Sequence, residues 1–578
     1  MSGSVNMKSS FAICFVGILC ISNAYGQIIP DSVRREAQRI EERESERTKE
    51  RERIFRDSQI RALGIDSVPE DIQSLDDSNE CIVVKAANIS GMSRYKMTDF
   101  SVLLNGLTGS CTKKSQIENL IRIITNKYVG DGYITSSVII LPEQNKDGVV
   151  RIAVIEGRLD IISGELNTDK AKYKTELESA FPRLSGRLLN LRDLEQGVDQ
   201  LARLSGSDPS IDIVPGINGA TSNLIVRRRA TAPWIRPSIT ISNDGSANTG
   251  RQVVTASVDI DSPFGAADFW SLYYIQDIQR GAAKGAEGYG GFFSLPYGYT
   301  TLFLSGGRYK FSTVLESNDL LFGNTGDSVN GAIGLDHLLF RDRRTKILVS
   351  ASISFYDTVN RIQDIRLSTN SYRVVSGQVG FRVQRRIGRG LVLADLTLSR
   401  GFDIFGADAA DIGPGSDGLK FRKLAGNLGY QAPILILGVP TDYSASLRGQ
   451  WALDSVLPVE RLSVGGSSTV RGFRDDGISG QRGAVFRQQF GIGLIKLFSD
   501  ARTNTTTQLS VIVGYDAGAI LLKPSDPFER GFLQSSTLGL RLLNRRMLAE
   551  ISVAAPLSAP ANVQRPRLEL SASVRLTI

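Results

Sequence analysis

Apolar and polar residues alternate along residues 233–578, and this pattern restricts the fold more than any other feature of the chain. A period of two places the two sets of side chains on opposite faces of an extended strand. A soluble sandwich would also alternate, but one continuous series of this length favours a closed barrel with an apolar outer face. At roughly 10 residues per strand plus connections, the region has room for about sixteen strands. One clear example is the series Val254, Thr255, Ala256, Ser257, Val258, Asp259 and Ile260.

The final segment, RLELSASVRLTI, continues the alternation to the last residue of the chain. We expect this strand to close the barrel against the first strand and to display an outer-membrane insertion signal. Its apolar positions are Leu568, Leu570, Ala572, Val574, Leu576 and Ile578.

Membrane crossing by helices is not indicated beyond the N-terminus. The longest later apolar runs, such as PILILGV at 433–439, are far shorter than the roughly 20 residues that a spanning helix needs. The 57 glycines outnumber the 19 prolines, which suits many tight turns between strands.

Two α+β units are predicted before the barrel, over residues 80–158 and 159–230. Each reads as strand, helix, helix, strand, strand, and the first unit opens with a single strand, CIVVKAANIS, over residues 81–90. In the second unit, Asn190 is placed to cap a helix. These units are either spacers or domains whose sheet edge accepts an incoming extended chain. The apolar helix positions are Ile117, Leu120, Ile121, Ile124 and Tyr128 in the first unit and Leu191, Leu194, Val198 and Leu201 in the second.

The first residues have the pattern of an export signal. Lys8 precedes the apolar run FAICFVGILCI, and Ala24, Tyr25 and Gly26 offer a cleavage site, so residues 1–26 are interpreted as a signal peptide that is removed.

The cysteines are consistent with export to an oxidising compartment. Cys14 and Cys20 leave with the signal peptide, which leaves Cys81 and Cys111 as a single pair, most simply a disulfide. Closing such a loop contributes roughly 3–4 kcal/mol in the chain-entropy model. We expect no metal site, because the one histidine, His337, lies far away in the sequence.

A highly charged segment follows the signal peptide. Acidic and basic residues at helical spacing over 31–56 predict a helix, with almost no apolar stripe. It is either a solvated arm or a helix lodged in a polar cavity, and at 1.5 Å per residue its length is about 39 Å. We assign residues 27–56 to this N-terminal plug helix and residues 57–79 to a linker.

The formal net charge of +8 does not indicate nucleic-acid binding, because the cations are spread along the chain. We expect no nucleic-acid partner.

A short motif in the C-terminal half carries a cation among small residues. The stretch VGGSSTVRGFRDDG at 464–477 contains Val470, Arg471, Gly472 and Phe473. Further on, VGYDAGA at 513–519 sets Asp516 in an apolar strand, beside Tyr515 and Gly518. A lone VRGF tetrapeptide is also compatible with a tight surface turn.

Together these motifs resemble the signatures of the Omp85/TpsB superfamily of outer-membrane β-barrels. The resemblance implies that the VRGF loop folds back into the barrel and that Arg471 pairs with Asp516 there. The order of the two α+β units and the phrase GVVRIAVIEGR resemble the POTRA domains of TpsB transporters, including a bridged pair of cysteines in the first. The stretches ISNDGSANTGR, LSRGFDIFGA and LRGQWA also resemble the family, whereas the C-terminal Ile578 departs from its usual aromatic end.

The resemblance implies a two-partner secretion transporter in a Gram-negative outer membrane, with its POTRA domains in the periplasm. The implied partners are an unfolded TpsA-like exoprotein, outer-membrane lipid and lipopolysaccharide, and the barrel assembly machinery during biogenesis. The implied fold class is a transmembrane antiparallel β-barrel of about sixteen strands after two α+β POTRA domains and an N-terminal helix.

No enzyme is indicated, because the sequence lacks HExxH, GxSxG, a P-loop and a cluster of metal ligands. We therefore expect neither a catalytic residue nor a cofactor. Two alternatives remain. An Omp85-type assembly factor would share Arg471 and Asp516, but typically has more POTRA domains. A general porin would lack both the POTRA units and the VRGF loop.

Overall fold

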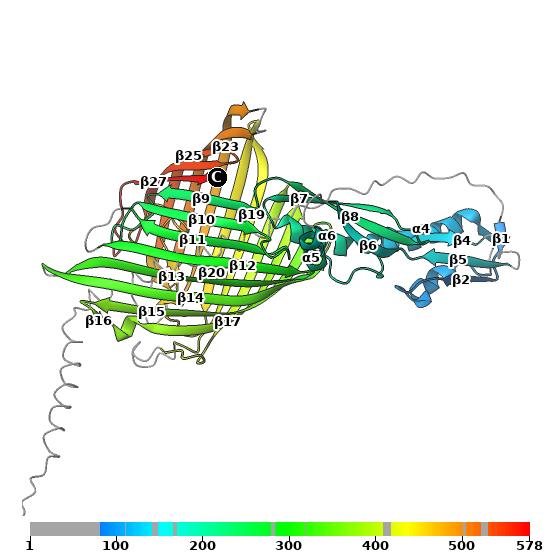
Figure 1. Cartoon of the computed structure of the whole chain (residues 1–578), viewed down its shortest axis with the longest axis horizontal. Helices are drawn as coiled ribbons and strands as arrows, with labels where there is room; N and C mark the ends of the chain where they lie inside the picture. The colour runs from blue at the N-terminus through cyan, green and yellow to red at the C-terminus, as the bar shows by residue number, and fades with distance from the viewer. Residues whose placement is uncertain are drawn as a thin grey trace, which may run out of the picture.

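The computed structural model describes residues 81–109, 111–141, 148–165, 170–278, 284–317, 319–408, 418–500, 505–521 and 530–578. The expected signal peptide (1–26), plug helix (27–56) and linker (57–79) lie outside these residues. Figure 1 shows an elongated molecule in which two α+β units follow one another and lead into a large barrel.

The barrel consists of sixteen antiparallel strands in the described part of the chain, and each pairs with its neighbours in sequence order. The predicted fold class is thereby confirmed for the barrel and the two units before it. The strands are β9 (Ile235–Ser242), β10 (Val253–Asp261), β11 (Phe269–Asp277), β12 (Gly285–Tyr297), β13 (Thr300–Ser317), β14 (Leu320–Arg341), β15 (Thr345–Ile362), β17 (Tyr372–Ile387), β18 (Gly390–Phe402), β19 (Arg422–Ile436), β20 (Val439–Ala452), β23 (Arg482–Asp500), β24 (Thr505–Ile520), β25 (Gly531–Leu543), β26 (Met547–Ser558) and β27 (Glu569–Thr577).

The barrel closes where its last strand meets its first. β27 pairs with β9 from Ser573 opposite Ser242 to Thr577 opposite Ser238, so the prediction that the final segment closes the barrel is confirmed. Short elements decorate the connections: β16 (Ile365–Arg366), η3 (Ser368–Asn370), η4 (Pro458–Glu460), β21 (Leu462–Val464) and β22 (Ile478–Gly480).

Apolar and polar residues alternate along the barrel strands, so the two faces of the barrel wall carry different side chains. On β17, Val379 and Phe381 are 57% and 45% exposed, whereas Ser376 is buried. On β18, Leu396 and Leu398 are likewise exposed. A closed sheet with an apolar outer face and a polar inner face is the arrangement that a lipid bilayer requires.

The first α+β unit places two helical segments against a three-stranded sheet of order β2-β5-β4. One strand was expected over 81–90, but the chain changes partners after Val83, so β1 pairs with β3 and β2 pairs with β5. The helix face predicted for α4 is buried at Ile117, Leu120, Ile124 and Tyr128. The elements are β1 (Cys81–Val83), β2 (Ala86–Ser90), η1 (Met97–Phe100), α3 (Ser101–Asn105), β3 (Cys111–Lys113), α4 (Lys114–Gly130), β4 (Ser137–Ile140) and β5 (Val149–Ile155).

The second α+β unit repeats this order with a sheet of order β6-β8-β7. The Asn190 side chain accepts a hydrogen bond from the Arg192 backbone N–H and caps α6, which orients that helix. α6 is buried on its polar side as well as on its apolar side, because the barrel covers the polar side. The elements are β6 (Arg158–Glu165), α5 (Lys170–Ala180), α6 (Leu191–Ala202), β7 (Ser207–Pro215) and β8 (Thr221–Ala230).

Candidate functional site

The connection between β20 and β23 folds back against the inner wall of the barrel. Within it, β21 and β22 form a small antiparallel hairpin, with Val464 opposite Ile478. The tip carries Val470 and Phe473, which are 0% and 2% exposed. They pack in a small apolar cluster with strand residues such as Val485, Ile520 and Leu533, so the hairpin, hereafter the lumen loop (residues 462–480), has a core of its own.

Arg471 and Asp516 form the polar centre of this contact. Arg471 Nε donates to Asp516 Oδ2 at 2.6 Å, and its Nη2 donates to Oδ1 at 2.9 Å. The Arg471 backbone N–H also donates to Oδ2 at 3.1 Å. The Asp516 side chain is fully buried, so this forked, charge-assisted contact is what compensates the carboxylate for its lost hydration.

Two further side chains on β23 complete the cluster. Gln489 Oε1 accepts a hydrogen bond from Arg471 Nη1 at 2.9 Å, and Arg487 Nε lies 3.4 Å from Asp516 Oδ1. Neither was singled out from the sequence. Both could have been suspected from the predicted barrel, because polar residues of a barrel strand point toward the lumen. The register of β23 with β24 decides which of them lie beside Asp516, and that register could not be predicted.

Glycines make room for the lumen loop. Gly514 and Gly518 flank Asp516 on the same face of β24; a Cβ on Gly514 would collide with the Arg471 guanidinium, and one on Gly518 with Val464. In the loop, Gly472 has a φ of +89°, and its missing side chain lets the backbone lie against Pro556. Tyr515, which belongs to the same motif, lies on the opposite face of β24, as strand alternation requires.

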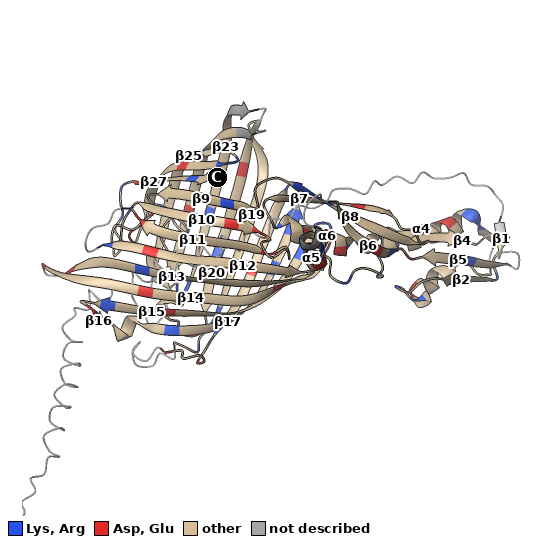
Figure 2. Ribbon diagram, viewed as in Figure 1, with Lys and Arg blue, Asp and Glu red and all other residues tan. Residues whose placement is uncertain are grey.

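Beside the loop, the lumen retains a polar cavity of about 400 Å³. Side chains of both charge signs line it, among them Arg382, Asp395, Lys423, Arg448 and Glu460. Figure 2 shows that cations and anions are interspersed over the barrel strands. Such a wall can hold a charged chain through ion pairs, each of which contributes little.

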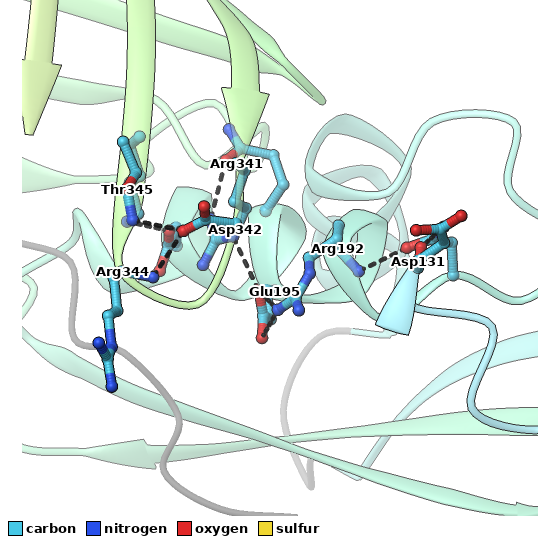
Figure 3. A network of polar contacts seen from close by, with 11 residues as sticks. Asp131, Arg192, Glu195, Arg341, Asp342, Arg344 and Thr345 are labelled. Atoms are coloured by element: carbon cyan, nitrogen blue, oxygen red, sulfur yellow. Dashed lines mark hydrogen bonds and ion pairs between the residues drawn. The ribbon is translucent and has the colours of Figure 1, made fainter. Parts of the chain in front are cut away.

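A second polar cluster joins α6 to the rim of the barrel that faces the α+β units (Figure 3). Arg341, at the end of β14, donates to Glu195 at 2.9 Å and also bonds Asp199. Lys346 on β15 pairs with the same carboxylate oxygen, Asp199 Oδ2. The backbone N–H groups of Arg344 and Thr345 both donate to Asp342 Oδ1 at 2.7 Å, which shapes the turn that presents Arg341.

The next turn of the rim also meets α6. The Gln196 and Gln200 side-chain amides both donate to the Gly298 carbonyl, and the Tyr299 hydroxyl donates to Asp193 at 2.6 Å. Burial and this hydrogen bond together raise the pKa of Tyr299. Burial lowers the pKa of Arg203, at the end of α6, to about 10, so its guanidinium remains charged at neutral pH. The second α+β unit is therefore fastened to the rim by many buried polar contacts.

The chain matches three known family models. Residues 220–542 match the family model described as haemolysin secretion/activation protein ShlB/FhaC/HecB, which is more than half of the chain. Residues 82–157 match the ShlB-type POTRA domain, and residues 161–215 match a further POTRA domain. The chain belongs to the ShlB/FhaC/HecB family.

Curated relatives of this ShlB/FhaC/HecB protein are transporters by name. It is 28% identical over 488 residues to the outer membrane transporter CdiB of Dickeya dadantii, covering 84% of each chain. It is 28% identical over 529 residues to the hemolysin transporter protein ShlB of Serratia marcescens, covering 91% of this chain and 88% of that one. Among solved structures, CdiB from Escherichia coli aligns with a TM-score of 0.83 at 25% identity, covering 94% of this chain and 98% of the other.

Membership confirms the resemblance to TpsB-type transporters of the Omp85 superfamily. It places the barrel in the outer membrane and the two POTRA domains in the periplasm. In the first POTRA domain, Cys111 is disulfide-bonded, and its strand β3 pairs with β1, which carries Cys81.

The described residues provide neither a metal-binding cluster nor a helix that could span a membrane. They contain no group of three or more histidine, cysteine or acidic residues that could hold a metal ion. His337 shares a hydrogen bond of 2.8 Å with the Thr300 hydroxyl. None of the helices described in the structure has the length and apolarity needed to cross a membrane.

Proposed function

We propose that this protein captures an unfolded exoprotein in the periplasm with its POTRA domains and passes it through its barrel to the cell surface. Two sets of contacts support the proposal, one at the rim of the barrel and one inside it. The second POTRA domain is fastened to the barrel rim through α6, and the barrel contains a loop that is held against its wall by Arg471 and Asp516. Transporters of the same family named CdiB, ShlB and HpmB support this function.

Capture can use a free sheet edge, where unpaired backbone groups accept an added strand. The described strands β2 and β4 are the edges of the first POTRA sheet, and β6 and β7 those of the second. β7 contains Pro209 and Pro215, which lack the backbone N–H that an added strand would need. β2, β4 and β6 contain no proline, so each POTRA domain keeps at least one edge whose backbone N–H groups can all pair with an added strand.

We further propose that residues 31–56 act as a reversible plug. Their charge pairs favour a helix without an apolar face, and the lumen cavity offers side chains of both signs. Surface ion pairs are worth about 0–1 kcal/mol each, so several can hold the helix while still allowing it to leave. The linker over 57–79 would give it room to move.

Relatives named as transporters support a role without catalysis. We infer that the chain is not an enzyme and uses no cofactor. Folding of the passenger outside the cell would then supply the free energy for export. The remaining proposed partners are lipopolysaccharide and lipid around the apolar barrel surface, and the barrel assembly machinery during biogenesis.

The test is co-expression with a candidate TpsA-like exoprotein, in a host that lacks a two-partner secretion pair. We expect full-length passenger in the medium with the intact transporter, and passenger held in the periplasm with an Asp516→Ala barrel that is inserted in equal amount. If the passenger stays in the periplasm with both, while the assembly of other outer-membrane barrels depends on the chain, the protein is an assembly factor instead.

A further inference from the structure

The seam between β27 and β9 is the shortest ladder that either strand makes. β9 pairs with β10 over its whole length, from Ile235 to Ser242, but with β27 only from Ser238 onward. The Ile578 N–H donates to the Pro237 carbonyl at 2.9 Å, so the polar backbone edge of Pro237 faces β27. Because proline has no backbone N–H, Pro237 cannot donate a hydrogen bond to β27, and this end of the seam lacks one ladder hydrogen bond.

Arg474, three residues after Arg471, binds both strands of this seam at its opposite end. On the β27 side, its Nε lies 2.6 Å from Glu569 Oε1, and its Nη2 donates to the Leu570 carbonyl and the Ser571 hydroxyl, both at 2.8 Å. On the β9 side, its Nη1 donates to the carbonyl of Asn243, directly after the strand.

The Arg474 side chain is only 5% exposed. Its backbone N–H donates to Glu569 Oε2 at 3.0 Å, so this residue binds the seam with its main chain as well as its side chain. A guanidinium has a rigid fork of five donors, which lets one residue bridge acceptors on two strands.

The next two loop residues bind the connections that flank the seam. Asp475 accepts hydrogen bonds from the Ala247 N–H at 2.8 Å and from Arg251 Nη2 at 2.6 Å, both in the connection from β9 to β10. Asp476 accepts one from the Gln564 N–H at 2.6 Å, in the connection from β26 to β27. Three consecutive charged residues thus contact the segments on both sides of the closure.

These residues lie close in sequence to the Arg471–Asp516 pair. Only Gly472 and Phe473 separate Arg471 from Arg474, and Phe473 is buried in the apolar core of the lumen loop. We propose that Arg474, with Asp475 and Asp476, is a latch that holds the seam closed from the lumen, so that displacing the lumen loop loosens the pairing of β27 with β9. The latch concerns the barrel itself and does not rest on the identity of the passenger.

The test measures amide hydrogen exchange of the seam strands in the purified full-length protein, inserted in nanodiscs. Arg474→Met removes the guanidinium group. Amide exchange over residues 573–577 should then be faster by about tenfold or more, because the seam can open without breaking charge-assisted hydrogen bonds. Arg474→Lys should restore part of the protection, since an ammonium keeps the charge but not the fork. Glu569→Gln removes the ionic partner with little change of shape, and it tests the latch even if the arginine variant does not fold.

Two comparisons separate a latch from a local structural role. Asp516→Asn leaves Arg474 intact and lies on β24, away from the seam, yet it should also speed exchange at the seam, because it frees the loop. Arg541→Met removes a more exposed arginine–glutamate pair, which joins β25 to β26 and does not bridge the seam, and it should leave exchange at the seam unchanged. Unchanged seam protection in Arg474→Met and Glu569→Gln would refute the latch, and unchanged protection in Asp516→Asn would refute its coupling to the loop.

Discussion

Arg471 and Asp516 lie 45 residues apart in the sequence and share three hydrogen bonds, two from the guanidinium and one from the backbone N–H of the arginine. Removing one member of such a buried pair leaves a charge without compensation and costs about 3–5 kcal/mol. Removing both is milder. We therefore expect Arg471→Ala, Asp516→Ala and the double variant to be strongly non-additive in barrel unfolding and in export.

The matched control for this cycle is Gln489→Ala, which removes only one neutral partner of Arg471 and should cost about 1 kcal/mol. Strict additivity of the two charge deletions would mean that the pair does not act as a unit.

Gly472 should tolerate no side chain. Its φ of +89° is a conformation that other residues rarely adopt, at a cost of order 1–3 kcal/mol, and a Cβ would come within 3.1 Å of the Pro556 ring. We expect Gly472→Ala to lower both the unfolding temperature of the barrel and export. Gly449→Ala is the control, because a Cβ there meets no atom closer than 3.7 Å. Equal stability of the two variants would show that the loop adapts.

Deletion of residues 80–230 should leave a barrel that inserts and conducts ions but exports nothing, because the edges that capture the passenger are lost. Insertion is checked by heat-dependent gel mobility and export by passenger in the medium. Since strand addition uses backbone groups, passenger binding to the intact protein should survive many side-chain changes in the passenger. Export by the truncated barrel would exclude a capture role for the POTRA domains.

The contacts of Arg341 should keep the second POTRA domain in a fixed position on the barrel. Arg341 is 5% exposed and binds both Glu195 and Asp199, so Arg341→Met leaves two buried carboxylates with fewer partners. We expect the distance distribution between spin labels at Ile217 and Leu437, both highly exposed, to broaden. The exposed pair of Arg229 with Asp208 is the control, because such pairs contribute only about 0–1 kcal/mol. An unchanged distribution in Arg341→Met would assign the docking to other contacts.

Deletion of residues 31–56 should raise ion conductance while secretion largely persists, and high salt should favour the open state of the intact protein by screening its ion pairs. A Gly/Ser segment of the same length controls for linker length. A disulfide that tethers the helix to the lumen wall should block export until it is reduced. Full secretion with the tether intact would show that the helix need not leave.

Local periodicity explains why much of the fold could be predicted. The period of two in the strands, the helical spacing in α4 and α6 and the cap at Asn190 are each set by residues close in sequence, and each appears in the structure. The single strand expected over 81–90 shows the limit of such reasoning. Its residues all favour extended structure, but two different partner strands divide them.

The residue types of the lumen loop motif and the strand that faces it could also be recognised from the sequence alone. Only the tertiary structure decided that Gly514 makes room for Arg471, that Arg474 reaches across the closing seam, and that the polar side of α6 is buried on the barrel rim. These contacts depend on the register and curvature of a closed sheet. Register is set by the sum of all neighbouring strand pairs, so no short stretch of sequence contains it.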